Sequence, residues 1–345
     1  MRILLFITLV TASNLGLAAD EVSKGKNSDD IPGISIKEHK PLPNSQIQFR
    51  IKAVRAVDDD LIYAAELALK TYDNDIDYTK VRNRGWKRHT IKRPGAIFGS
   101  SETIVLIRVL EWTKDIEIAI RGTSSFDDVV RDLDAKAEFD KQLQIPIHSG
   151  FRDIAQGVNT FLQKEFPEKE FRDYKFQLYG HSLGGAVANI AAMYLHEKGK
   201  KVSLVATFGA PRFTTNEGAR KYQVLNQVTF RVVRCDDVVP FLPPPNFFGW
   251  TNNSYEASGN LLLLLYPPYF DYSVGVDIER DFTYQLRREL ANAVGRKKLA
   301  LGHRMDNYYA LLLHYSRQYL YSSEEDIYPV SYQLSQQSKM CPSNL

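Results

Sequence analysis

The 345-residue sequence is poor in cysteine and in net charge, and long apolar runs are missing from it. Its only two cysteines lack the spacing of a zinc site, and in an oxidising compartment Cys235 and Cys341 could either pair or stay apart. A formal net charge of +3 is too small to argue for nucleic acid, and no nucleic-acid-binding motif is present. We therefore expect no metal, no cofactor and no nucleic-acid partner.

The first residues have the layout of a secretory signal peptide. Met1-Arg2 is a short basic start, Ile3 to Val10 is apolar, and Ala18-Ala19 offers a cleavage site between small residues. The apolar run is shorter than the about 20 residues that a membrane-spanning helix needs. We expect a secreted or periplasmic protein, with an uncleaved N-terminal membrane anchor as the alternative.

The composition divides the chain into three parts. Residues 1–19 are the expected signal peptide. Residues 20–50, rich in Lys, Asp, Ser and Pro, are expected to form a mobile leader. Residues 51–345 have ordinary globular composition, and we expect them to form a single domain.

Segments typical of strands and of helices alternate along this domain. The expected strands are Thr103–Val109, Asp115–Ile120, Tyr174–Tyr179, Val202–Phe208, Gln227–Val233 and Leu261–Leu265. The expected helices are Asp58–Tyr72, one beginning near Phe151, Leu183–His196 and Thr215–Tyr222. This alternation predicts an α/β fold with right-handed crossovers and a mostly parallel central sheet. The basic stretch 80–93 is expected to be a solvated loop, with contact to anionic lipid as the alternative.

One glycine-rich motif has the pattern of a catalytic turn. Gly180 to Gly184 reads G-x-S-x-G, with Ser182 at its centre, between an expected strand and an expected helix. This is the context of the nucleophile elbow in the α/β-hydrolase fold, which carries helices on both faces of its sheet. A simple turn capped by Ser182 is the alternative, but a cap does not require glycine on both sides.

A nucleophilic serine needs an imidazole base and a carboxylate that orients it. In this fold the acid follows the serine in the chain, and the histidine follows the acid. Of the seven histidines, only His303 and His314 come after the candidate acids, and His314 lies in a helical pattern. We therefore favour His303. Asp236 and Asp237 follow the second strand after the elbow, and position alone does not choose between them.

The oxyanion of an acyl-transfer intermediate needs two N–H donors. The backbone of Leu183, directly after the serine, is one candidate. Thr123, in the turn that follows the strand Asp115–Ile120, is the other, although it could instead cap the next helix.

Two apolar segments are candidates for contact with a substrate. The segment Ser124–Leu133 has an amphipathic helical pattern, typical of a movable lid or of a helix packed on the core. The aromatic residues after the acid could line an acyl groove or belong to the local core. The tentative substrate-binding residues are Phe126, Val129, Val130, Phe247, Phe248 and Trp250.

Taken in order, these motifs resemble those of the class 3, fungal-type lipases over roughly residues 55–320. The matching segments are Arg121-Gly122-Thr123 with Asp132-Leu133, His148–Phe151, Gly180–Gly185, Phe208–Arg212, Asp237–Pro244 and His303–Tyr309. The resemblance implies that Asp237 is the acid, because the family's catalytic aspartate directly precedes an aliphatic-aliphatic-proline run. Three features depart from the family. Val129 stands where fungal enzymes often have Trp, the stretch from Tyr272 to Leu301 is longer and more helical than expected of the family, and two cysteines cannot form the usual disulfide set.

The resemblance implies a triacylglycerol lipase-like ester hydrolase that works through a Ser-His-Asp triad, with a lipid or ester as its substrate and transient contact with a lipid surface. A phospholipase A1 or an esterase for soluble esters would use the same fold. A peptidase with the same triad and a non-catalytic binding module are further alternatives.

Overall fold

The computed structural model describes residues 59–76, 85–92, 102–123, 136–234, 236–243, 254–264, 270–273 and 302–319. The expected signal peptide, the expected leader and both cysteines lie outside these residues. Within the described ranges, no helix has the length and apolar character needed to cross a membrane.

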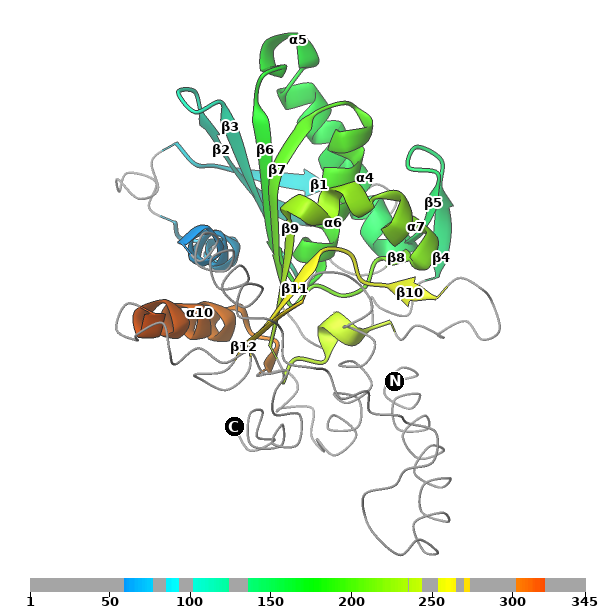
Figure 1. Ribbon diagram of the computed structural model, residues 1–345. Coiled ribbons are helices and arrows are strands. Elements are labelled where there is room, and N and C mark those ends of the chain that lie inside the picture. The colour runs from blue at the N-terminus through cyan, green and yellow to red at the C-terminus, as the bar shows by residue number, and fades with distance from the viewer. Residues whose placement is uncertain are drawn as a thin grey trace, which may run out of the picture.

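An eight-stranded sheet forms the centre of the molecule (Figure 1). In spatial order its strands are β1 (Lys87–Lys92), β2 (Glu102–Leu110), β3 (Asp115–Ile120), β6 (Lys175–His181), β7 (Lys201–Phe208), β9 (Thr229–Arg234), β11 (Asn260–Leu264) and β12 (Phe270–Ser273). Neighbouring strands from β3 to β11 run parallel, whereas β1, β2 and β12 pair antiparallel at the two edges. The sheet is therefore mostly parallel, as predicted.

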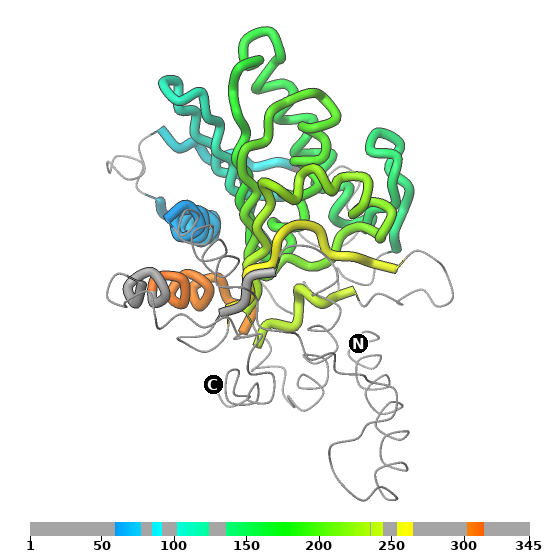
Figure 2. The backbone as a smooth tube through the Cα atoms, in the orientation of Figure 1, coloured from blue at the N-terminus to red at the C-terminus, as the bar shows by residue number. Residues whose placement is uncertain are grey.

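Helices cover both faces of this sheet, because its strands are apolar on both sides. On β3, Ile118 packs into the cluster beneath α4 (Ser149–Glu165) and α6 (Leu183–Glu197). The next residue, Ala119, packs into the opposite cluster with α10 (Met305–Tyr319) and the helix over residues 59–70. The tube in Figure 2 shows these last two helices, blue and orange, on the same side of the sheet. The predicted α/β-hydrolase-type architecture is confirmed.

The helix α6 follows the elbow and is buried along almost its whole length. Every residue from Leu183 to Leu195 is buried, because α6 lies between the sheet and α4. Its run of Ala, Val, Ile and Gly lacks a polar face, as expected of a helix covered on all sides.

A second, four-stranded antiparallel sheet was not predicted. It consists of β10 (Tyr255–Glu256), β8 (Thr214–Thr215), β5 (Ile145–His148) and β4 (Ala137–Asp140). The remaining short elements are α5 (Glu168–Phe171), α7 (Asn216–Lys221), and the 3₁₀ helices η2 (Gln223–Val228) and η3 (Val239–Phe241).

Two details of the sequence interpretation were wrong. The expected strand Gln227–Val233 begins only at Thr229, because its first residues belong to η2. The expected basic loop is a strand over Lys87–Lys92, paired with β2. Trp86 just before it is only 6% exposed, and the Arg108 guanidinium lies 4.9 Å from its ring centroid. The contact between the Trp86 ring and the Arg108 guanidinium on β2 thus helps to hold β1 against the sheet.

Candidate active site

Ser182 occupies a strained turn between β6 and α6. Its backbone has φ 56° and ψ −131°, a conformation that side chains rarely adopt. The Ser182 N–H donates to the carbonyl of Phe208 on β7 (2.9 Å), and the Ser182 carbonyl accepts from the N–H of Gly185 (2.9 Å). A Cβ at Gly184 would lie 2.2 Å from the carbonyl oxygen of Ile120. The glycine there lets α6 begin against β3, which places the serine at the end of the central strand.

The structure brings Ser182, His303 and Asp237 together from three separate parts of the chain. Ser182 Oγ lies 2.7 Å from His303 Nε2, and His303 Nδ1 lies 2.8 Å from Asp237 Oδ2. Ser182 and Asp237 are fully buried and His303 is 5% exposed. With Nδ1–H donating to the carboxylate, Nε2 is left as the acceptor of the serine hydroxyl proton.

The two neighbouring aspartates have different partners. Asp237 accepts from the N–H of Val239 at Oδ1 (2.9 Å) and from the hydroxyl of Tyr308 at Oδ2 (2.6 Å), the oxygen that also faces His303. Burial raises the pKa of Tyr308 well above its ordinary value, so this phenol remains a proton donor. Asp236 instead turns to Arg234, with contacts of 2.9 and 2.7 Å. Only Asp237 is placed to orient the imidazole.

His181, inside the elbow, makes two contacts of its own. Its Nε2 lies 2.7 Å from the backbone oxygen of His303, and its Nδ1 lies 2.7 Å from the hydroxyl of Tyr72. Burial, and to a smaller extent the neighbouring His303, lower the pKa of His181 to about 3. His181 is therefore neutral at ordinary pH.

The two candidate oxyanion donors belong to segments that pass next to the nucleophile. Leu183 is the first residue of α6, directly after Ser182. A Cβ at Gly122 would lie 3.1 Å from Ser182 Cβ, so the turn after β3 passes beside the serine. Thr123 is the next residue in this turn, and its role as the second N–H donor stays a prediction.

The tentative substrate-binding residues are not among those that the structure describes. These residues are Phe126, Val129, Val130, Phe247, Phe248 and Trp250. The expected lid segment Ser124–Leu133 also lies outside the described residues. In the described part of the chain, no group of three or more His, Cys, Asp or Glu side chains could hold a metal ion.

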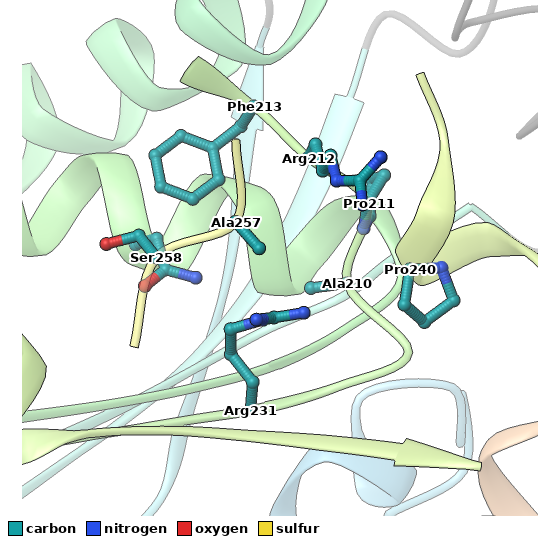
Figure 3. A pocket seen from close by; sticks show the side chains of 9 residues that line it. Ala210, Pro211, Arg212, Phe213, Arg231, Pro240, Ala257 and Ser258 are labelled. Carbon is teal, nitrogen blue, oxygen red and sulfur yellow. The ribbon is translucent and has the colours of Figure 1, made fainter. Parts of the chain in front are cut away.

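Arg212 holds the loop that carries the acid. Its backbone N–H donates to the carbonyl of Leu242 (2.8 Å), and its guanidinium donates to the carbonyls of Phe241 (3.0 Å) and Pro243 (3.3 Å). Figure 3 shows Arg212 and Arg231 lining a small pocket together with Pro240 of this loop. Ser182, Asp237 and His303 do not line this pocket.

Sequence reasoning assigned no role to four residues that support the site. Tyr308 and Arg212 stand inside the quoted motifs, but no spacing rule links them to the acid. Tyr72 lies just after the first helix and His181 is the variable position of the elbow motif, so neither carries a signal in the sequence. Their roles depend on contacts between residues far apart in the chain.

Comparison with known proteins gives a consistent result over the same region. The family model described as lipase (class 3) matches residues 117–247. A lipase of Caenorhabditis elegans is 36% identical over 100 residues, which are 28% of each chain. A secreted mono- and diacylglycerol lipase of Fusarium solani is 30% identical over 146 residues, 41% of this chain and 43% of that protein. The chain thus aligns with less than half the length of these curated relatives.

Among solved structures, a lipase from Rhizopus microsporus var. chinensis is 25% identical, with a TM-score of 0.48. That match covers 61% of this chain and 75% of the other. The matched segment 117–247 contains Ser182 and Asp237, two of the three residues that meet at the site, whereas His303 lies outside it. Residues 117–247 are thus the part of this chain that is similar to class 3 lipases.

Proposed function

We propose that the protein is an exported serine ester hydrolase of lipase type, which cleaves lipid esters through an acyl-enzyme on Ser182. The observation that supports this most strongly is the hydrogen-bonded order Ser182–His303–Asp237, at 2.7 and 2.8 Å, in a buried site. Such a constellation has the geometry of a nucleophile, its base and an orienting acid.

The proposed reaction follows from this geometry. His303 Nε2 takes the proton of the Ser182 hydroxyl while Oγ attacks the ester carbonyl, and Asp237 stabilises the imidazolium. The N–H groups of Leu183 and Thr123 receive the oxyanion. His303 then gives the proton to the leaving alcohol. In the second half of the reaction, His303 takes a proton from the water that attacks the acyl carbon, and gives it to Ser182 Oγ as the acyl–serine bond breaks.

The substrate class is inferred from the relatives. They are named as lipases, and one acts on mono- and diacylglycerol by its name. We therefore infer that acylglycerols are substrates of this chain, and that the site meets them at a lipid surface. The word "secreted" in that relative's name, together with the signal-peptide pattern of residues 1–19, supports export.

Replacing the nucleophile tests the proposal. Ser182→Ala should reduce kcat on a dissolved short-chain p-nitrophenyl ester by about 10⁶-fold, because it removes the covalent route and leaves only binding and oxyanion contacts. It should also abolish labelling by a fluorophosphonate probe. Thermal unfolding of the variant should stay cooperative, which shows that the fold is intact. Turnover at the wild-type level would refute the mechanism.

A substrate panel tests the inferred class. Initial rates on triglyceride emulsion, phospholipid vesicles, dissolved p-nitrophenyl esters and the matching anilides should favour the emulsion and exclude the amides. A preference for phospholipid would indicate a phospholipase, and a preference for dissolved esters would indicate an esterase. Turnover of anilides at the ester rate would contradict the proposed bond type.

A further inference from the structure

Two hydrogen bonds connect Tyr72, just after the first helix, with the elbow and the histidine segment. The hydroxyl of Tyr72 lies 2.7 Å from His181 Nδ1, and His181 Nε2 lies 2.7 Å from the backbone oxygen of His303. A Cβ at Gly122 would lie 2.5 Å from the Tyr72 hydroxyl oxygen, so the turn beside Ser182 packs against the same hydroxyl.

The direction of each bond is fixed by chemistry. The carbonyl of His303 can only accept, so His181 Nε2 carries the proton. Nδ1 of the neutral ring is then an acceptor, and Tyr72 donates to it. Both ring nitrogens of His181 are satisfied in one orientation only, so the two bonds specify one arrangement of these segments.

We propose that His181, held by Tyr72, is a positioning residue that fixes the main chain of His303 and so sets the distance between its imidazole and Ser182 Oγ. The inference rests on the proposed function. The His303 side chain is attached to the backbone that His181 hydrogen-bonds, and its Nε2 must stay within hydrogen-bond distance of Ser182 Oγ. A displacement of about 1 Å at such a position lowers turnover by about 10²-fold.

The same residue must remain uncharged during the reaction. The rings of His181 and His303 lie with their centroids 4.8 Å apart, and His303 becomes an imidazolium when it takes the serine proton. The ionisable groups around His181 are Tyr72, Arg121, His303, Asp237 and Tyr308. Burial disfavours the charged form of His181 most strongly, so a second cation does not compete with the one on His303.

The experiment compares four variants of the full chain with the wild type. His181→Phe and Tyr72→Phe each remove a partner in these hydrogen bonds. His181→Gln keeps one donor and one acceptor. Tyr63→Phe is the matched control, because Tyr63 lies on the helix that leads to Tyr72 and its hydroxyl contacts Glu117 and Arg108 instead. For each, kcat and KM are measured on a dissolved short-chain ester, and the His303 Nδ1 proton that faces Asp237 is followed by proton NMR.

We expect His181→Phe to lower kcat by about 10²-fold and Tyr72→Phe by about tenfold, with KM within about twofold. The His303 proton resonance should shift or broaden in both. His181→Gln should recover to within about tenfold of wild type, and Tyr63→Phe should match wild type within about twofold. If His181→Phe does not fold, Tyr72→Phe decides the outcome.

The inference is overturned if Tyr72→Phe and the folded His181 variants keep the wild-type resonance and a kcat equal to that of Tyr63→Phe. In that case Ser182→Ala would still be inactive, and the proposed hydrolase would stand. Wild-type turnover by Ser182→Ala would instead refute the proposed function itself. The two failures are therefore distinguished by the same set of proteins.

Discussion

Replacement of Asp237 by asparagine is the sharpest test of the site. The Asp237 carboxylate accepts hydrogen bonds from His303 and Tyr308 at Oδ2 and from Val239 at Oδ1. An amide has the same shape but only one acceptor atom, so its NH₂ group must face a donor on one of the two sides. If it faces His303, the imidazole loses its Nδ1 proton and holds one at Nε2, where it blocks proton transfer from the serine.

The expected loss can be set from this change. A triad with its imidazole in the wrong tautomer loses roughly 10⁴-fold in kcat, which corresponds to about 5.4 kcal/mol of transition-state stabilisation. The opposite amide orientation leaves the Val239 N–H against an NH₂ group, and an unsatisfied buried donor costs about 1–3 kcal/mol of folding stability. We therefore expect Asp237→Asn to lose activity while it remains folded.

Asp236→Asn provides the matched control. The same chemical change is made one residue earlier, where the carboxylate pairs with Arg234 and its side chain is 32% exposed. A partly exposed ion pair contributes at most about 1 kcal/mol, so kcat should stay within a few-fold of wild type. The assay is kcat and KM on a dissolved short-chain ester, with thermal unfolding as the check on folding. A larger loss for Asp236→Asn than for Asp237→Asn would refute the assignment of the acid.

Three more results are expected. Gly184→Ala should lower the free energy of unfolding by about 3 kcal/mol or more, because the added Cβ would meet a backbone oxygen at 2.2 Å. Urea-induced unfolding measures this loss, and a loss below about 1 kcal/mol would contradict the expectation. Tyr308→Phe should cost about 1–3 kcal/mol of unfolding free energy and lower kcat about tenfold. Asp237 loses a hydrogen-bond donor, and the backbone N–H of Arg234 loses its acceptor. Unchanged turnover would count against a role of Tyr308 in orienting the acid. The pKa of His181 is lowered to about 3 in the folded protein, whereas an unfolded histidine titrates near pH 6.5. Between about pH 6.5 and 3 the unfolded chain therefore binds one more proton at this residue than the folded protein does. In this range the free energy of unfolding should fall with decreasing pH by at most about 1.4 kcal/mol per pH unit. Urea unfolding from pH 7 to 4 should show a shallower fall for His181→Gln, and equal slopes would exclude His181 as the source.

The central part of the fold was predictable because its signals are local. The parallel strands are short apolar runs, and α6 follows a glycine-rich turn directly, so both could be read from neighbouring residues. The order of acid and histidine in the chain was enough to prefer His303 over His314. For the acid, position left Asp236 and Asp237 open, and only the resemblance to class 3 lipases chose between them. The structure places Asp237 beside His303 because the chain turns between the two aspartates.

The parts that were missed carry weak or misleading local signals. β8 and β10 have two residues each, too few for any periodicity. β1 is an edge strand of mainly polar and charged residues. Such residues protect sheet edges from aggregation, but they also give the strand the composition of a loop. The bond between His181 and His303 joins residues 122 positions apart, and no pattern along the chain encodes it.

The wide separation of Ser182 and His303 has a consequence for synthesis of the protein. The two residues are 121 positions apart, and His303 lies just before α10. During translation, the elbow and the parallel strands are therefore synthesised before the imidazole base is added to the chain. The nascent protein consequently holds a serine hydroxyl without a base, and the proposed triad is complete only when the segment that carries His303 has docked. Activity would then report that this segment has been added and has folded against the sheet.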